Sequence, residues 1–120
     1  MEESKMSWSK HTKEANGIGD YTLKKEDYFN PREMLEAYGP DVKILGGYLN
    51  TEAKHGAHPV IFCETPDGVK GLSLSASYFE QWKAIFNDPD DVKTILDGNA
   101  TGTLVSRKSK NHGEYIAFNI

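Results

Sequence analysis

The sequence predicts a mainly β fold, a five-stranded Greek-key barrel with a helix between the third and fourth strands. Two observations predict it. The first is the order of elements after Val42, which is three short strands, a helical stretch and two further strands. The second is that similar polar segments, TEAKHGAH and SRKSKNHG, join the first two strands and the last two. A sheet of unspecified α+β type with one helix on a face is the alternative.

The five strands are expected from short apolar runs that are bounded by turn residues. Gly46-Gly47 in the first strand indicates a bulge, which suits a strand that must curve around a small barrel. Thr65–Gly68 has the composition of a tight turn. Alternation in the last strand points Ile116, Phe118 and Ile120 inward and Tyr115 outward. The expected strands are 42–50, 59–64, 69–75, 101–107 and 114–120.

Helix starts are marked by capping residues. Asn30-Pro31 begins a short N-terminal helix that ends at Gly39, because an amide cap followed by proline is typical of the first turn. A capping box at Ser77 starts the helix between strands three and four, and Asp88-Pro89 starts its second part. Residues 1–19 are polar and without periodicity, so we expect a flexible arm, followed by a single domain over 20–120.

Composition excludes several classes of protein. No apolar run reaches the length of a membrane span, and the N-terminus lacks the apolar stretch of a secretion signal. Cys63 is the single cysteine and cannot form an internal disulfide, so a reducing cytoplasm is the expected location. It lies in an apolar run, so we expect its thiol to be buried. The sequence contains no enzyme signature. It contains no zinc signature either, because His55, His58 and His112 do not have zinc-ligand spacing. We therefore expect neither catalysis nor a cofactor.

Charge is unevenly distributed along this chain, whose formal net charge is −4. Residues 99–120 carry three basic side chains against one acidic side chain, whereas residues 20–41 and 87–98 are acidic. Phosphates need cations within reach, and bases need flat rings on which to stack. Polar hairpin tips have a similar composition, and that reading stays open. The candidate nucleic-acid-binding residues are Lys54, His55, Arg107, Lys108, Lys110 and Tyr115, with Tyr48 and Phe62 as further stacking candidates.

From Asn30 onward the chain resembles the OB-fold single-stranded-DNA-binding proteins that bacteriophages encode. The resemblance lies in the order of NPREMLEAYG, VKILGGY, KHGAHPVIF, GLSLS and the final LVSRKSKNHGEYIAFNI. It implies an OB-fold-like core that coats single-stranded DNA in phage replication or recombination, in the host cytoplasm. It also implies a homodimer or higher homo-oligomer, and replication or recombination proteins as partners.

An alternative function rests on the two acidic segments. A phage accessory factor or inhibitor could present Asp88, Asp90 and Asp91 to a basic host protein. Such an acidic protein-interaction module would be indifferent to single-stranded DNA.

Overall fold

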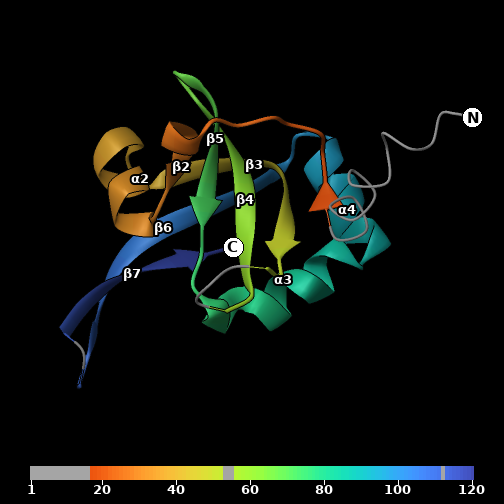
Figure 1. Ribbon diagram of the computed structural model, residues 1–120. Coiled ribbons are helices and arrows are strands. Elements are labelled where there is room, and N and C mark those ends of the chain that lie inside the picture. Colours follow the sequence, from red (N-terminus) through yellow and green to blue (C-terminus); the bar gives the residue numbers. More distant parts are fainter. Residues whose placement is uncertain (1–16, 53–55, 112) are drawn as a thin grey trace, which may run out of the picture.

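The chain folds around one seven-stranded sheet that curls into a half-barrel (Figure 1). This computed structural model describes residues 17–52, 56–111 and 113–120. The prediction of a mainly β fold is confirmed. The strands are β1 (Gly17–Ile18), β2 (Tyr28–Phe29), β3 (Asp41–Asn50), β4 (His58–Thr65), β5 (Gly68–Ser73), β6 (Ala100–Ser109) and β7 (Gly113–Asn119).

The five expected strands correspond to β3 through β7, and they pair antiparallel in the order β5-β4-β3-β6-β7. Two short strands were not expected: β1 pairs with β3, and β2 pairs in parallel with β5. Among the described residues no pairing joins β5 to β7, and the free edge of β5 carries β2 instead. The expected barrel-like character is confirmed, whereas the sheet has seven strands in the described part of the chain and not the five that were expected.

The glycine pair in β3 allows one strand to serve both halves of the sheet. The register against β4 shifts between Ile44 and Gly46, as expected for a bulge. Before the bulge β3 pairs with β6, and after it β3 pairs with β1. A Cβ on Gly46 would lie 2.2 Å from the carbonyl oxygen of Ile18, and one on Gly47 would lie 2.5 Å from that of Val60. Any side chain would therefore push the neighbouring strands away.

Three α-helices lie in the described part of the chain, and two of them begin at the capping side chains that were expected. The Asn30 side chain accepts a hydrogen bond from the backbone N–H of Glu33, and Asp88 accepts from those of Asp90 and Asp91. The expected capping box at Ser77 is absent, because a 3₁₀ turn precedes α3. The helices are α2 (Pro31–Tyr38), α3 (Phe79–Phe86) and α4 (Pro89–Leu96), with 3₁₀ turns η1 (Lys25–Asp27) and η2 (Ala76–Tyr78).

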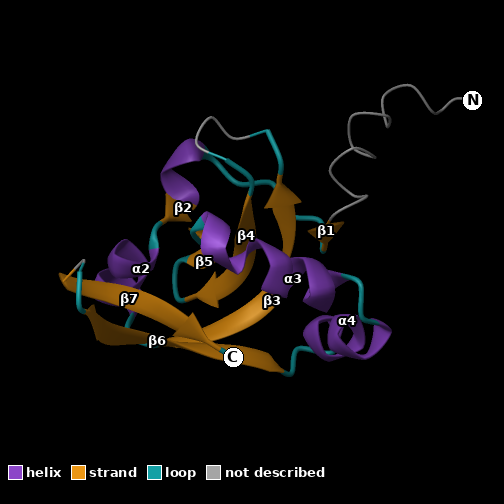
Figure 2. Cartoon of the chain, turned by 90° about the horizontal axis from the view of Figure 1, so that it is seen from below, coloured by secondary structure: helices purple, strands orange, loops and turns teal. Residues whose placement is uncertain are grey.

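The helices close two different sides of the curled sheet (Figure 2). Helices α3 and α4 pack side by side against β3, while α2 packs against β5 and β7. The core between them is centred on Trp82, which is 1% exposed and stacks on Phe118 with ring centroids 6.2 Å apart. None of the helices in residues 17–52, 56–111 and 113–120 is long and apolar enough to cross a membrane.

The start of the described chain belongs to the sheet. Gly17 and Ile18 pair with β3, and the Ile18 side chain is 8% exposed within the core. We expected residues 1–19 to form a flexible arm. The end of that range instead belongs to the sheet, because burial of Ile18 against β3 anchors it. Residues 1–16 lie outside the described residues.

Candidate nucleic-acid interface

The β6–β7 hairpin extends beyond the rest of the sheet (Figure 1). Strand β6 pairs with β3 only over Ala100–Thr103, whereas its pairing with β7 runs from Thr103 to Ser109. The outer part of the hairpin therefore has strand neighbours only within itself. It presents its side chains to solvent on two faces, which makes it accessible to a large ligand.

The basic side chains predicted to bind nucleic acid lie on this projecting part. Arg107, Lys108 and Lys110 are all exposed. No ion pair within the described part of the chain involves any of them. Lys108 stands directly across the ladder from Glu114, whose carboxylate accepts a hydrogen bond from the Ser106 hydroxyl. The hairpin thus carries three accessible cations and one carboxylate.

Tyr115 lies beside these cations. It is 45% exposed and directly opposite Arg107 in the ladder, while Ile116 is half-buried and Phe118 is 3% exposed. The predicted alternation is confirmed for these three side chains. The expectation that Ile120 points inward is corrected, because it follows the end of β7 and is 58% exposed. An exposed phenol ring next to a guanidinium is suited to stacking on a base while the cation meets a phosphate.

The two other aromatic candidates are not accessible in the same way. Phe62 is only 4% exposed, and its ring lies 5.2 Å from that of Tyr21 and 5.7 Å from that of Tyr48. Tyr48 is half-buried, and burial together with a hydrogen bond to Tyr28 raises the pKa of its hydroxyl. The prediction that Phe62 stacks on a base is corrected, since neighbouring tyrosines already cover its ring.

Residues 19–29 cover this aromatic face, and we call them the strap. Tyr21 lies against Phe62, and the ring of Tyr28 lies over Gly71 so closely that a Cβ there would be 2.8 Å from it. The backbone of Tyr28 and Phe29 forms β2 on the edge of β5. The strap therefore occupies both a face and an edge of the sheet.

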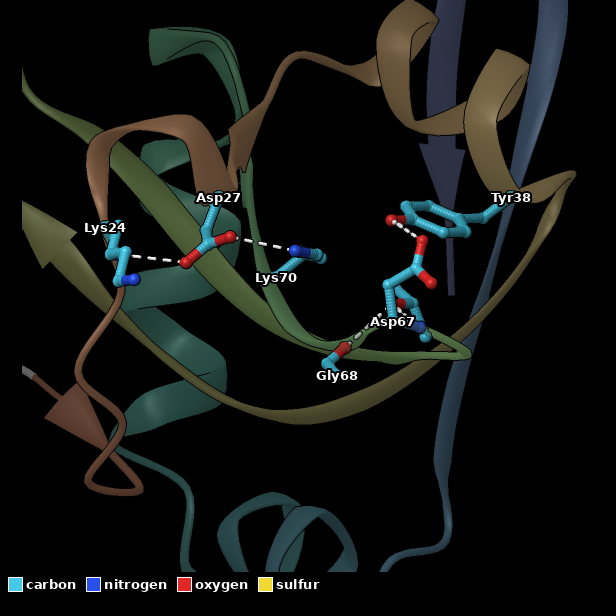
Figure 3. Close-up of polar contacts among 7 residues, drawn as sticks. Lys24, Asp27, Tyr38, Asp67, Gly68 and Lys70 are labelled. Atoms are coloured by element: carbon cyan, nitrogen blue, oxygen red, sulfur yellow. Dashed lines mark hydrogen bonds and ion pairs between the residues drawn. The ribbon is translucent and has the colours of Figure 1, made fainter.

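An ion pair anchors the strap to β5 (Figure 3). The Lys70 ammonium lies 2.8 Å from Oδ1 of Asp27, and Oδ2 of Asp27 accepts a hydrogen bond from the backbone N–H of Lys24. The hydrogen bond from Lys70 lowers the pKa of Asp27, and the same bond raises the pKa of Lys70. The two side chains are 43 residues apart in the sequence, so no local pattern predicted their contact.

A second polar contact holds α2 against the β4–β5 turn (Figure 3). The Tyr38 hydroxyl donates a hydrogen bond of 2.9 Å to Oδ2 of Asp67. Within the turn, Thr65 Oγ1 donates to the Gly68 carbonyl and accepts from the backbone N–H of Asp67. The turn predicted at these residues is confirmed, and its aspartate also positions the helix.

The first polar loop contributes little that can be placed. Lys54 and His55 lie outside the described residues, and so does His112, so their roles stay predictions. His58 is half-buried, with Nδ1 3.3 Å from the carbonyl oxygen of Gly56. In the described part of the chain, no three histidine, cysteine or acidic side chains gather as a metal site would require.

A cleft of about 480 Å³ opens beside the outer part of the hairpin, between the start of α2, the segment around η2 and β7. Tyr115 lines it together with Arg32, which the sequence did not mark as a site residue. Arg32 was missed because 82 residues separate it from Glu114 and only the packing of α2 on β7 brings the two segments together. The lining residues are Asn30, Pro31, Arg32, Ser75, Ser77, Tyr78, Glu114, Tyr115 and Ile116.

Comparison with known proteins adds no family to this picture. No family model matches the chain, and neither a curated protein nor a solved structure matches it. The function must therefore be argued from the hairpin and the cleft.

Proposed function

We propose that this protein binds single-stranded DNA without catalysis, along the projecting β6–β7 hairpin. The observation that carries the proposal is the pairing of Arg107 with Tyr115 at the outer part of the hairpin, where both side chains are exposed. Lys108, on the other face of the hairpin, and Lys110, in its turn, are two further exposed cations. By its resemblance to phage single-stranded-DNA-binding proteins of the OB-fold type, the chain would coat DNA during replication or recombination, as a homodimer or higher homo-oligomer with replication proteins as partners.

The physical basis is counterion release together with stacking. A stacked base contributes about 1–3 kcal/mol, and every ring face can be used whatever the base. Each phosphate that a lysine or arginine neutralises makes log Kd depend on log salt concentration with a slope of about 0.7. Contacts to about two to four phosphates would give an overall slope of roughly 1.5 to 3. Stacking and counterion release together support binding that is largely independent of DNA sequence and strongly dependent on salt.

The decisive test is a titration of fluorescein-labelled oligo-dT with the protein at low salt, followed by fluorescence anisotropy. We expect saturable binding that weakens as salt is raised. Replacing Arg107, Lys108 and Lys110 together by alanine should weaken binding and flatten the salt slope, because the cations that release counterions are gone. Absence of binding at tens of micromolar protein would refute the proposal.

A matched variant separates the hairpin from overall charge. It removes the same number of positive charges from exposed positions on η1, α3 and α4, which lie outside the hairpin. We expect its salt slope to equal that of the unmodified protein. If this variant loses as much affinity as the hairpin variant, the DNA-binding surface is not the hairpin. The control positions are Lys25, Lys83 and Lys93.

A further inference from the structure

The cleft beside the outer part of the hairpin is lined by both a cation and a carboxylate. Arg32 enters it from the first turn of α2, and Glu114 enters it from the start of β7. Tyr115 borders the same cleft and is the ladder partner of Arg107. Tyr115 is therefore shared by the cleft and the hairpin surface that is proposed to hold DNA.

A carboxylate in this position does not fit a phosphate. Glu114 would repel a backbone phosphate, whereas Arg32 would attract one. An ionised carboxylate only accepts hydrogen bonds, and one oxygen of Glu114 already accepts from the Ser106 hydroxyl. A nucleotide satisfies both groups if its phosphate lies at Arg32 and a hydrogen-bond donor on its base lies at Glu114.

We propose that the cleft holds one nucleotide of the bound strand and selects bases that carry an amino group. This inference rests on the proposed function. The 4-amino group of cytosine donates to a glutamate, and adenine and guanine carry amino groups as well. Thymine has no amino group, and the two carbonyl oxygens beside its single N–H would face the carboxylate. The protein thus favours strands that contain cytosine, adenine or guanine over oligo-dT.

Cytosine and thymine provide the sharpest comparison, because both are small pyrimidines. The test measures the Kd for an alternating thymine–cytosine strand and for oligo-dT of the same length, under the same salt conditions. We expect the mixed strand to bind about tenfold more tightly or better, as for one added hydrogen bond to a charged acceptor. A strand in which cytosine is replaced by 2-pyrimidinone, which lacks the amino group, should return to the oligo-dT value.

Glu114→Gln identifies the acceptor, because it keeps the shape of the side chain and removes the charge. We expect it to lower the affinity ratio, because an amide oxygen accepts a weaker hydrogen bond from the amino group than a carboxylate does. It should also raise the affinity for oligo-dT, since a negative charge leaves the interface. The matched control Glu80→Gln, on the exposed side of α3, should leave the ratio unchanged. Because each ratio is taken within one variant, a change in stability does not imitate the effect.

The outcomes distinguish this inference from the proposed function. Equal affinity for the two strands, or a ratio that is unchanged in Glu114→Gln, would overturn base selection in the cleft and leave DNA binding intact. If neither strand binds at tens of micromolar protein, both proposals fail together. Arg32→Gln should weaken the binding of both strands by the same factor. An unchanged affinity would mean that no phosphate contacts Arg32.

Discussion

The Lys70 ammonium and the Asp27 carboxylate form an ion pair of 2.8 Å that joins the strap to β5. Both side chains are largely shielded, with exposed fractions of 16% and 20%. This contact connects a short 3₁₀ turn to the middle of a strand, and the strap beyond it covers Phe62 and Gly71. The ion pair therefore helps to hold the strap over this face of the sheet, which makes the face inaccessible to a ligand.

The first prediction concerns the stability contributed by this pair. Lys70→Met and Asp27→Asn should each lower the free energy of unfolding, because each leaves one partner without its counter-charge. In the double variant the loss should be smaller than the sum of the two single losses. The measurement is a double-mutant cycle by urea denaturation. Strictly additive losses would mean that the two side chains do not interact in solution.

The second prediction is the pH dependence of the same contact. The pKa of Asp27 is lowered in the folded state, so its stabilisation is present above its unfolded pKa of about 3.9 and is lost as pH falls through the folded pKa. The pKa of Lys70 is raised, so its stabilisation is present below about 10.4 and is lost as pH rises through the folded pKa.

Urea denaturation over a pH series would measure this window. The difference in free energy of unfolding between the unmodified protein and Asp27→Asn should be constant near neutral pH and shrink at acid pH. A difference that persists unchanged below pH 3 would contradict the assignment.

The third prediction separates the covered aromatic face from the hairpin. Phe62→Leu should lower stability by about 1 kcal/mol and leave the Kd for oligo-dT unchanged, because the ring is buried beneath Tyr21 and Tyr48. Tyr115→Ala should instead weaken binding by about 1–3 kcal/mol with little change in stability. Anisotropy titrations and urea denaturation on both variants would check this. Weaker DNA binding by Phe62→Leu would show that the strap moves aside.

The fourth prediction concerns the cysteine. Burial raises the pKa of the Cys63 thiol to about 12, and its Sγ donates a hydrogen bond to the Ile61 carbonyl. At neutral pH the native protein should react with a thiol reagent far more slowly than the protein unfolded in urea, since the thiolate is the reactive form. Absorbance after addition of a disulfide reagent would follow the reaction. Equal rates in the two states would contradict burial.

The fifth prediction tests the bend in β3. Gly47→Ala should destabilise the protein by about 1–3 kcal/mol or more, because its Cβ would meet the Val60 carbonyl and the ring of Phe86. Gly98→Asn is the control, since Gly98 has φ of 78°, a conformation that asparagine tolerates, and a Cβ there would meet only the end of the Lys43 side chain, at 3.9 Å. Thermal unfolding would compare the two. Similar losses at both positions would argue against a close approach at the bend.

Local patterns in the sequence determined much of the secondary structure. Hydrophobic alternation placed Phe118 inward and Tyr115 outward, and capping chemistry placed the starts of α2 and α4 at Asn30 and Asp88. The glycine pair marked the bend in β3. These features depend on residues within a few positions of one another, so the sequence alone contains their causes.

Only the tertiary structure decided which aromatic rings are exposed and which charges meet. The sequence marked Phe62 in β4 and Tyr48 in β3 as candidates for base stacking. In the structure the strap covers them, because Tyr21 contacts Phe62 and Tyr28 contacts Tyr48. Arg32 and Glu114 reach one cleft because α2 packs on β7. By itself the sequence determined the five longer strands, the bend and the cationic hairpin, whereas long-range packing decided the two short strands, the strap, the ion pair and the cleft. The reason is that periodicity reports neighbours along the chain, and contacts between distant segments depend on how the whole sheet curls.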